Sequence, residues 1–387
     1  MAVEEQSTTS TPSVLDSFPV SISASLTSKG GFMITDTELI KAQRALTREC
    51  IANFGKSLFT GENIMRRSIP IKKLVWTPMS QIQQLTQQLL SNLSFLRKAS
   101  LVSGLERFEL CVAYVIGCLY PTVVDQHKAF NPIIGECYED CLFVKQGDDQ
   151  AKVNITGEQV ANHPPACLYT IYEDNAEYKI VGGAELIVSI GLNKVKITRK
   201  GINSICFSTG NPKRVTFDFP TFHLVGLLWG IRWGFFSGNL RIRGYDHQEN
   251  ASLNEMCQYI PVLRKNADYS KEEENMAFEC IVRFQRRSNL NIVDGSIVDK
   301  NNLQKSFVSG SWTDSIIIGN VNYNVVTSET SVHSLFSERR LPMDGCLRED
   351  IAMFMADEID KANVIKAELE ERQRSDRTLR ASSSSKA

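Results

Sequence analysis

Three segments of this chain combine cations with polar groups that suit an anion. The first reads Lys128-Ala-Phe-Asn131-Pro-Ile-Ile-Gly-Glu136, the second Glu158-Gln159-Val160-Ala-Asn162-His163-Pro164-Pro165, and the third places Lys366, Glu370 and Arg374 four residues apart. On a helix of 3.6 residues per turn, the last three fall within about 80° of one another and share a face. These clusters are the candidate binding residues.

Taken separately, each cluster also has a purely structural interpretation. Charged residues at i, i+4 spacing are typical of a solvated helix with ion pairs. Lys128 alone would be a surface lysine. His163 precedes two prolines, which favour extended backbone before them, so it would be a histidine at a strand end.

Motifs for catalysis and metal binding are weak or missing. Gly55-Lys56-Ser57 has the end of a P-loop without its first glycine, and the five histidines show no H-E-x-x-H spacing. No G-x-S-x-G elbow occurs. We therefore expect no enzyme, no metal and no cofactor.

Composition indicates a reduced, soluble protein. The formal net charge is −1, which argues against general binding to nucleic acid. The ten cysteines stand singly without a C-x-x-C pair, as in cytosolic proteins. The N-terminus lacks a basic and then apolar signal, and the most apolar stretch, Leu110 to Tyr120, is shorter than the roughly 20 residues of a membrane span. We expect a cytoplasmic protein that meets membranes from outside.

Helices are predicted before residue 121. Residues 1–30 are rich in Ser and Thr and are expected to be mobile. Within the lid or helix region 31–75, a capping box at Thr35–Glu38 begins a helix whose apolar face either packs in the core or forms a movable lid. In a helical scaffold at 76–120, Thr77-Pro78 and the capping box Ser103–Glu106 begin two helices, and the second is apolar nearly all round over residues 108–120.

Strand patterns dominate from about residue 137. About a dozen short runs alternate or are rich in β-branched and aromatic residues, without helices between them. Such a sheet must curl or close, and a barrel of that size is expected to enclose a cavity. We assign residues 121–345 to this β-barrel core, 346–380 to a C-terminal helical segment (a charged helix from about 351) and 381–387 to a disordered tail, with 31–380 forming one domain.

In order and spacing, the three clusters resemble those of the oxysterol-binding protein-related family of lipid transfer proteins. That family carries K-P-x-N-P-x-x-G-E, then E-Q-V-S-H-H-P-P, then K-x-x-x-E-x-x-x-R, and the resemblance covers roughly residues 46–380. It implies a mainly β fold with flanking helices: a large incomplete antiparallel β-barrel with an internal lipid tunnel and an N-terminal lid. The residues that match the family signature are Glu158, Gln159, Val160, Pro164 and Pro165.

The resemblance implies a role for each candidate residue. The headgroup of phosphatidylinositol 4-phosphate would be bound by Lys128, Asn131, Asn162, His163, Lys366, Glu370 and Arg374. A phosphomonoester brings about −1.5 to −2 charge, so several cations are needed. Glu370 would hold the cations and accept bonds from inositol hydroxyls.

Some positions depart from the family pattern. Ala161-Asn162 replaces Ser-His, so one titratable cation is lost, and Ala129 replaces the proline beside Lys128. We expect part of the C-terminal cover to be missing, because the sequence stops about a dozen residues after Arg374, and we expect no pleckstrin-homology or ankyrin region before the domain. Weaker headgroup affinity and less cover over the tunnel are expected.

The function implied is non-vesicular lipid transport. One tunnel would hold phosphatidylinositol 4-phosphate or a second lipid, a sterol or phosphatidylserine, and exchange them between membranes. A monomer that touches anionic membranes peripherally, at contact sites of endoplasmic reticulum, Golgi or plasma membrane, is expected by resemblance. The alternatives are a lipid-dependent sensor or tether without net transport and, with no visible nucleophile and base pair, an acyl hydrolase.

Overall fold

One large curved sheet makes up most of the molecule. In this computed structural model, the described residues are 25–27, 29–54, 68–146, 149–191, 193–246, 256–257, 260–263, 276–284, 289–326, 330–334 and 341–384. The segment expected to be mobile therefore lies almost entirely outside the described residues, as does Gly55-Lys56-Ser57. Among the described residues, eighteen strands join in one antiparallel sheet, and β3 and β4 form a separate parallel pair.

Strand boundaries follow the runs of alternating residues. The strands are β1 (Ser25–Leu26), β2 (Phe32–Met33), β3 (Trp76–Ser80), β4 (Lys128–Phe130), β5 (Cys137–Gln146), β6 (Asp149–Asn162), β7 (Pro165–Glu173), β8 (Tyr178–Gly191), β9 (Lys194–Lys200), β10 (Asn203–Phe207), β11 (Arg214–Phe217), β12 (Thr221–Val225), β13 (Trp233–Ser237), β14 (Asn239–Tyr245), β15 (Met276–Phe284), β16 (Ile292–Asp299), β17 (Gln304–Ser311), β18 (Ser315–Ile318), β19 (Val321–Asn324) and β20 (Thr330–Ser334).

The sheet divides into two arms at β8. Strands β20, β5, β6, β7 and β8 pair in that order. The first half of β8 then pairs with β10, from Tyr178 to Gly182, while its second half pairs with β9, from Glu185 to Gly191. One arm continues through β12, β13, β2 and β1, and the other through β11, β14, β15, β16, β17, β18 and β19. No ladder among the described strands joins the free edges, so the barrel is incomplete as expected.

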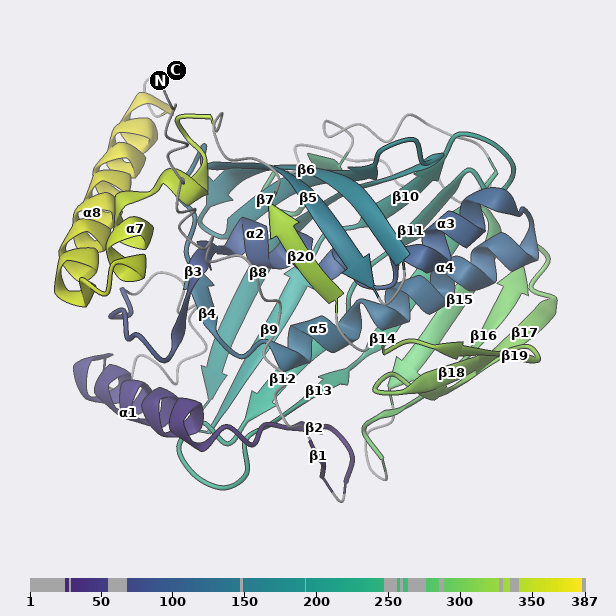
Figure 1. The fold of residues 1–387 in the computed structure, drawn as a ribbon, viewed down its shortest axis with the longest axis horizontal. Coiled ribbons are helices and arrows are strands. Elements are labelled where there is room, and N and C mark those ends of the chain that lie inside the picture. Colours follow the sequence, from purple (N-terminus) through teal and green to yellow (C-terminus); the bar gives the residue numbers. More distant parts are fainter. Residues whose placement is uncertain are drawn as a thin grey trace, which may run out of the picture.

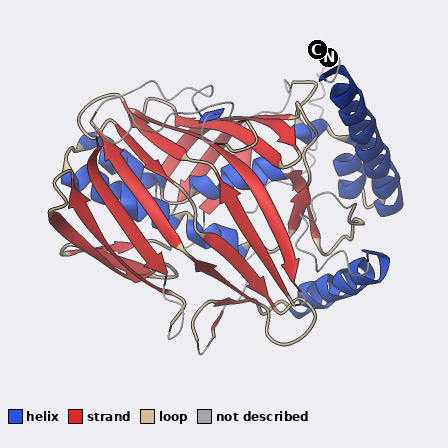
Figure 2. Cartoon of the chain, turned by 180° about the vertical axis from the view of Figure 1, so that it is seen from behind, coloured by secondary structure: helices blue, strands red, loops and turns tan. Residues whose placement is uncertain are grey.

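Helices fill the concave side of this sheet and cover one end of it. They are α1 (Thr37–Phe54), α2 (Gln81–Gln87), the 3-10 turn η3 (Gln88–Leu90), α3 (Leu93–Leu101), α4 (Leu105–Gly117), α5 (Leu119–Val124), η5 (Gly345–Leu347), α7 (Glu349–Met355) and α8 (Ile359–Ser384). Helices α1, α7 and α8 lie together at one end of the molecule (Figure 1). From behind, the strands form a broad face, with the central helices on its other side (Figure 2).

The central helices form the core together with the strands. Helix α4 is buried on nearly every side, as its apolar composition predicts, and its side chains join one cluster with residues of β5 through β18. Together α4 and α5 form a 20-residue stretch, Leu105–Val124, long and apolar enough to cross a membrane, but 78% of the tested window is buried in the fold. This stretch is a core helix in the structure.

Three predicted helix starts are wrong in detail. The N-cap of α1 is Asp36 and not the expected Thr35. The Asp36 carboxylate accepts a hydrogen bond from the Leu39 amide, at 2.9 Å. Thr77-Pro78 lies inside β3, whose parallel pairing with β4 overrides the local helix signal, so α2 begins at Gln81. The residue before α4 is Gly104 at φ 69°, and no side chain caps this helix. Ser103 is therefore not its cap.

The C-terminal helix also differs from the prediction. Residues near 351 belong to the short helix α7, which ends before Asp357 at φ 66°, and α8 begins only at Ile359. Helix α8 runs to Ser384, beyond the expected start of a disordered tail at residue 381. Leu46 of α1, Trp76 of β3 and Phe354 of α7 share a second apolar cluster, which joins this end of the molecule to the barrel.

Candidate functional site

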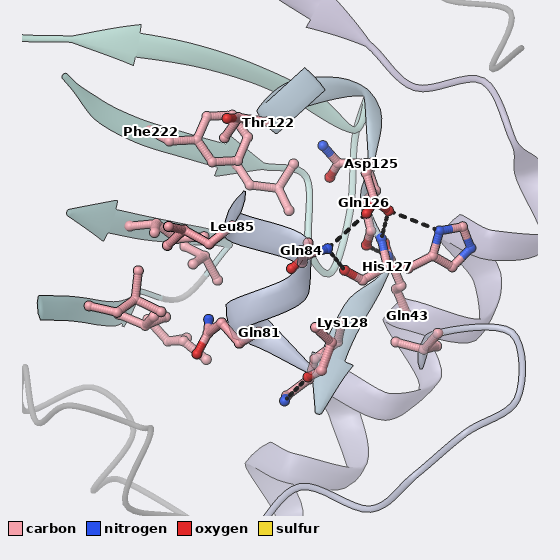
Figure 3. Close-up of a pocket in the computed structure, with 18 of the residues that line it drawn as sticks. Gln43, Gln81, Gln84, Leu85, Thr122, Asp125, Gln126, His127, Lys128 and Phe222 are labelled. Carbon is pink, nitrogen blue, oxygen red and sulfur yellow. Dashed lines mark hydrogen bonds and ion pairs between the residues drawn. The ribbon is translucent and has the colours of Figure 1, made fainter. Parts of the chain in front are cut away.

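A cavity lies between the N-terminal helices and the inner face of the sheet. It has a volume of about 290 Å³ and is lined by apolar side chains of β8, β9 and β12, with α1 and α2 on the other side. On α2 and the following turn, the residues at i, i+3, i+4 and i+7 face it: Gln81, Gln84, Leu85 and Gln88. Figure 3 shows part of this lining. We call it the inner cavity.

A second hollow of about 240 Å³ adjoins the first and is strongly basic. Asn131 lines both, so the two are neighbours. Four cationic side chains line it: Arg348, Lys366, Arg374 and Arg377. The one carboxylate among the described lining residues is that of Glu370. His163, an exposed residue, and Asn162 line it as well. We call it the basic pocket, and its charge favours an anionic ligand.

Backbone hydrogen bonds hold the first two sequence clusters together. The Gly135 amide donates to the Gln159 carbonyl at 2.8 Å, and the Gln159 amide donates to the Glu136 carbonyl at 2.9 Å. Gly135 takes φ 78°, a left-handed conformation that favours glycine. These backbone bonds join the signature residues on β6 to the segment that begins at Lys128.

Helix α8 brings the third cluster to the other two. Its Gln373 accepts a hydrogen bond from the Asn162 side chain, at 2.9 Å. Lys366 is 5% exposed and donates to Glu370 at 2.6 Å and to Ser68 at 2.9 Å. Arg374 is exposed and pairs with Glu371, at 2.9 Å. The expected shared face of Lys366, Glu370 and Arg374 is therefore present, and it faces the basic pocket.

Lys128 sits at the junction of the two hollows. Its ammonium donates to Asn131 at 3.1 Å and lies 4.0 Å from the centre of the Trp76 ring. The Lys366 ammonium lies 5.7 Å from the same ring. Burial lowers the pKa of Lys128 to about 7, with the positive charge of Lys366 adding to the effect and Glu370 opposing it. The charge of this lysine therefore varies near neutral pH.

A buried ion network adjoins the basic pocket through Arg348. Arg348 donates to Glu136 at 2.9 Å, to Asp350 at 2.7 Å and to the Asn131 carbonyl at 2.7 Å. The side chains of Glu136 and Asp350 are 2% and 0% exposed. Burial lowers the pKa of Arg348, but the two carboxylates outweigh it and raise that pKa, so the guanidinium stays charged. Burial raises the pKa of Glu136, against the effect of Arg348.

All seven predicted headgroup residues gather around the two hollows. Lys128 faces the inner cavity, Asn131 both hollows, and the other five the basic pocket. Of the signature residues, only Pro165 also lines the pocket. The other four shape strand β6 and its end. The Gln159 side chain donates to the Ala161 carbonyl at 2.6 Å, and Glu158 lies opposite Cys137 of β5 and Leu168 of β7 in the sheet. Val160 packs against a small apolar cluster, and Pro164 follows a cis peptide bond.

Several residues of the site were not among the sequence candidates. Gln373 and Arg377 continue the face of α8 that carries Lys366 and Glu370, so helical spacing could have identified them. Trp76 and Arg348 were missed because their contacts with Lys128 and Glu136 are made over long sequence distances. Across the described part of the chain, no group of three or more His, Cys, Asp or Glu residues is arranged to hold a metal, and all ten cysteines are free thiols.

Comparisons with known proteins agree on one family. The family model described as oxysterol-binding protein matches residues 58–266. Oxysterol-binding protein 9 of Dictyostelium discoideum is 26% identical over 353 residues, which cover 90% of this chain and 78% of that protein. Oxysterol-binding protein-related protein 1 of Homo sapiens is 24% identical over 237 residues, which cover 61% of this chain but only 22% of that longer protein.

Solved structures share the fold. The Osh1 ORD domain in complex with cholesterol superposes with a TM-score of 0.60 at 17% identity and covers 90% of both chains. The Osh3 ORD in complex with PI(4)P from Saccharomyces cerevisiae gives a TM-score of 0.61 at 18% identity, covering 86% of this chain and 84% of that one. At these identities the likeness establishes the architecture of the barrel and its helices.

Proposed function

Because this chain belongs to the oxysterol-binding protein family, whose domains bind lipids, we propose that it carries phosphatidylinositol 4-phosphate and a second lipid in turn between membranes. The observation that carries the proposal is the junction at Asn131 between an apolar cavity and a basic pocket. A lipid needs both environments, one for its tail and one for its headgroup. No bond is made or broken in this cycle, so we propose a carrier and not an enzyme.

The charge of the basic pocket matches the proposed headgroup. An inositol phosphomonoester brings about −1.5 to −2 charge, and the phosphodiester adds one more. Lys366, Arg374 and Arg377 provide three cations around the pocket, and Lys128 adds a fourth at its junction with the cavity. Arg348 is already neutralised by Glu136 and Asp350, so we assign it a supporting role.

Exchange follows from the use of one cavity by both lipids. Burying a tail contributes about 0.8 kcal/mol per methylene, so the carrier must enclose its cargo. Two lipids that need the same volume exclude each other, so uptake of one favours release of the other. A sterol, as in the cholesterol complex of the Osh1 domain, or phosphatidylserine is the proposed second cargo. The proposed setting is cytoplasmic, as a monomer docked briefly on anionic membranes.

A two-vesicle assay tests the function. Donor vesicles hold phosphatidylinositol 4-phosphate, acceptor vesicles hold a fluorescent sterol or phosphatidylserine, and movement is followed in both directions. We expect the two lipids to move in opposite directions. Binding without net movement would instead support a lipid sensor or tether, and a cleaved lipid would support a hydrolase.

Removing an exposed basic side chain of the basic pocket should weaken headgroup binding moderately. We expect His163→Ala and Arg374→Ala each to lower extraction of phosphatidylinositol 4-phosphate about threefold to tenfold, since solvent weakens charge pairs at exposed sites. Uptake of the second lipid should not change. Arg372→Ala is the matched control, because Arg372 is exposed on the same helix and does not line the pocket. Equal losses in the control and the two variants would contradict the assignment.

Restoring a histidine at position 162 should strengthen headgroup binding. Asn162 lines the basic pocket but cannot carry charge, whereas a protonated imidazole can. We expect Asn162→His to raise affinity for phosphatidylinositol 4-phosphate, by more at pH 6 than at pH 8, as measured by vesicle extraction. Asn154→His on the same strand, where Asn154 bonds Asp174 away from the pocket, controls for added charge. If Asn162→His shows no pH-dependent gain in affinity, position 162 does not contact the phosphate.

A further inference from the structure

One residue of the inner cavity breaks the pattern of its strand. In β9, Val195 and Ile197 face the cavity while Lys194, Lys196 and Lys200 are exposed on the other side. The next inward position is Arg199, which also lines the cavity. Alternation along a strand that lines an apolar cavity predicts a third apolar residue there. An arginine at this position puts a permanent positive charge inside the lipid-binding space.

The charge of Arg199 has no anionic partner among the described residues. Its Nη2 donates to the Gln88 side-chain oxygen, which also accepts from Thr122 at 3.2 Å, and its guanidinium lies 5.2 Å from the centre of the Phe219 ring. Burial lowers the pKa of Arg199, and the groups that oppose the shift are the neutral Tyr169, Cys167 and Cys118. A buried guanidinium needs several hydrogen-bond acceptors. Among the described residues Arg199 has one, the Gln88 side-chain oxygen, and shares it with Thr122.

Arg199 lies far from the basic pocket along the cavity. Gln81 and Gln88 both face the cavity and are seven residues apart, which corresponds to about 10 Å along a helix. Thr122, which bonds Gln88, lies at the opposite side of the drawn lining from Gln81 and Lys128 (Figure 3). The cavity therefore has cations at both ends, Lys128 at the junction and Arg199 at the inner end.

This arrangement distinguishes between ligands that could enter. An alkyl end packed against Arg199 would exclude water and offer no acceptor, so an uncharged end is less favourable there than an anionic one. A carboxylate or sulfate would accept two parallel hydrogen bonds from the guanidinium and neutralise it. A single cation is balanced by a single negative charge.

We propose that the inner cavity admits an amphiphile that enters with a monoanionic group first, a carboxylate or a sulfate, and that Arg199 binds this group. This proposal rests on the proposed function and changes its second cargo from a sterol or phosphatidylserine to an amphiphile with one acidic group. The apolar body then lies between β8, β9 and α2. Two sources share this chemistry, a fatty acid and a sulfated sterol.

Matched pairs of ligands test the inference. Radiolabelled palmitate and hexadecanol form one pair, and cholesteryl sulfate and cholesterol the other. Each is offered in neutral phosphatidylcholine vesicles, and protein-bound label is counted after the vesicles are removed. We expect wild-type protein to favour the anion over the alcohol by about tenfold in at least one pair, as one charge-assisted hydrogen bond allows. The pair that responds identifies the apolar body.

Variants then connect the preference to Arg199. Arg199→Gln should reduce it to less than about threefold, Arg199→Lys should retain part of it, and Lys196→Gln, the exposed neighbour on the same strand, should leave it unchanged. Equal binding of anion and alcohol by wild-type protein in both pairs overturns the inference, and this comparison needs no variant to fold. A preference that survives in Arg199→Gln overturns it too.

Extraction of phosphatidylinositol 4-phosphate by the same preparations separates this inference from the proposed function. Wild-type protein that extracts the phosphoinositide without preferring anions contradicts the inference alone. Protein that prefers anions but never extracts the phosphoinositide contradicts the exchange cycle alone.

Discussion

Replacing Arg348 by Met is expected to lower the free energy of unfolding by about 3 to 5 kcal/mol, a large part of the stability of a typical domain. The guanidinium is the shared partner of Glu136 and Asp350, and both carboxylates are almost fully buried. Without it, two negative charges remain in an interior that cannot hydrate them. Urea unfolding followed by circular dichroism measures the change.

Two controls separate this effect from simple loss of side-chain volume. Neutralising both acids in the triple variant Arg348→Met, Glu136→Gln, Asp350→Asn should restore most of the stability, because no unpaired charge is left buried. Lys73→Met removes one partner of an exposed pair with Asp357 and should cost at most about 1 kcal/mol. A loss below about 1 kcal/mol for Arg348→Met would show that the two acids take up protons at little cost.

Affinity for phosphatidylinositol 4-phosphate should fall as the pH rises above about 7, because Lys128 then loses its proton in the free protein. Burial lowers the pKa of Lys128 to about 7, and a bound phosphate would raise it. The charged form binds the anion, so affinity is highest below the free pKa and falls by up to tenfold per pH unit above it. Binding should be measured from pH 6.5 to 9, where the phosphomonoester stays mostly dianionic.

Substitutions at Lys128 test this explanation directly. Lys128→Ala should weaken binding about 10- to 100-fold at pH 6.5, and the difference from wild type should shrink towards pH 9. Lys128→Arg keeps its charge throughout, so its affinity should depend much less on pH. The exposed Lys73→Ala variant should follow the wild-type curve. A wild-type affinity that stays constant across this range would contradict a titrating Lys128.

The fold class was predictable because hydrophobic periodicity survives in the structure. The alternation of β9 and the all-round apolar sequence of α4 describe local surroundings, and both are found as expected. Helix starts were predicted less well, since Trp76–Ser80 has the local pattern of a helix N-terminus but pairs with Lys128–Phe130, about 50 residues later. Long-range pairing outweighs a local cap signal there.

In the candidate site, too, local sequence patterns were predictive and long-range contacts were not. The three sequence clusters gather around the two hollows, and their use in headgroup binding stays a prediction until it is tested. Arg348 gives no local sign of two of its three contacts, because Asn131 and Glu136 are more than 200 residues away in the chain. Arg199 is a charged residue at an inward position of its strand, which the sequence alone shows. Its proposed role in binding can be inferred only from the cavity that it lines.

The pairing of β2 with β13 has a consequence for how the protein is made. Met33 pairs with Trp233, and Phe32 with Gly234, so β2 has no barrel partner until residues about 200 positions later have left the ribosome. At 5 to 20 residues per second, that delay is about 10 to 40 s. The segment that leads into α1 must therefore join strands β8, β9 and β12, which leave the ribosome well after it. Its ladder to β13 has only two paired residues, so burial of Phe32 in the main core has to supply much of its attachment.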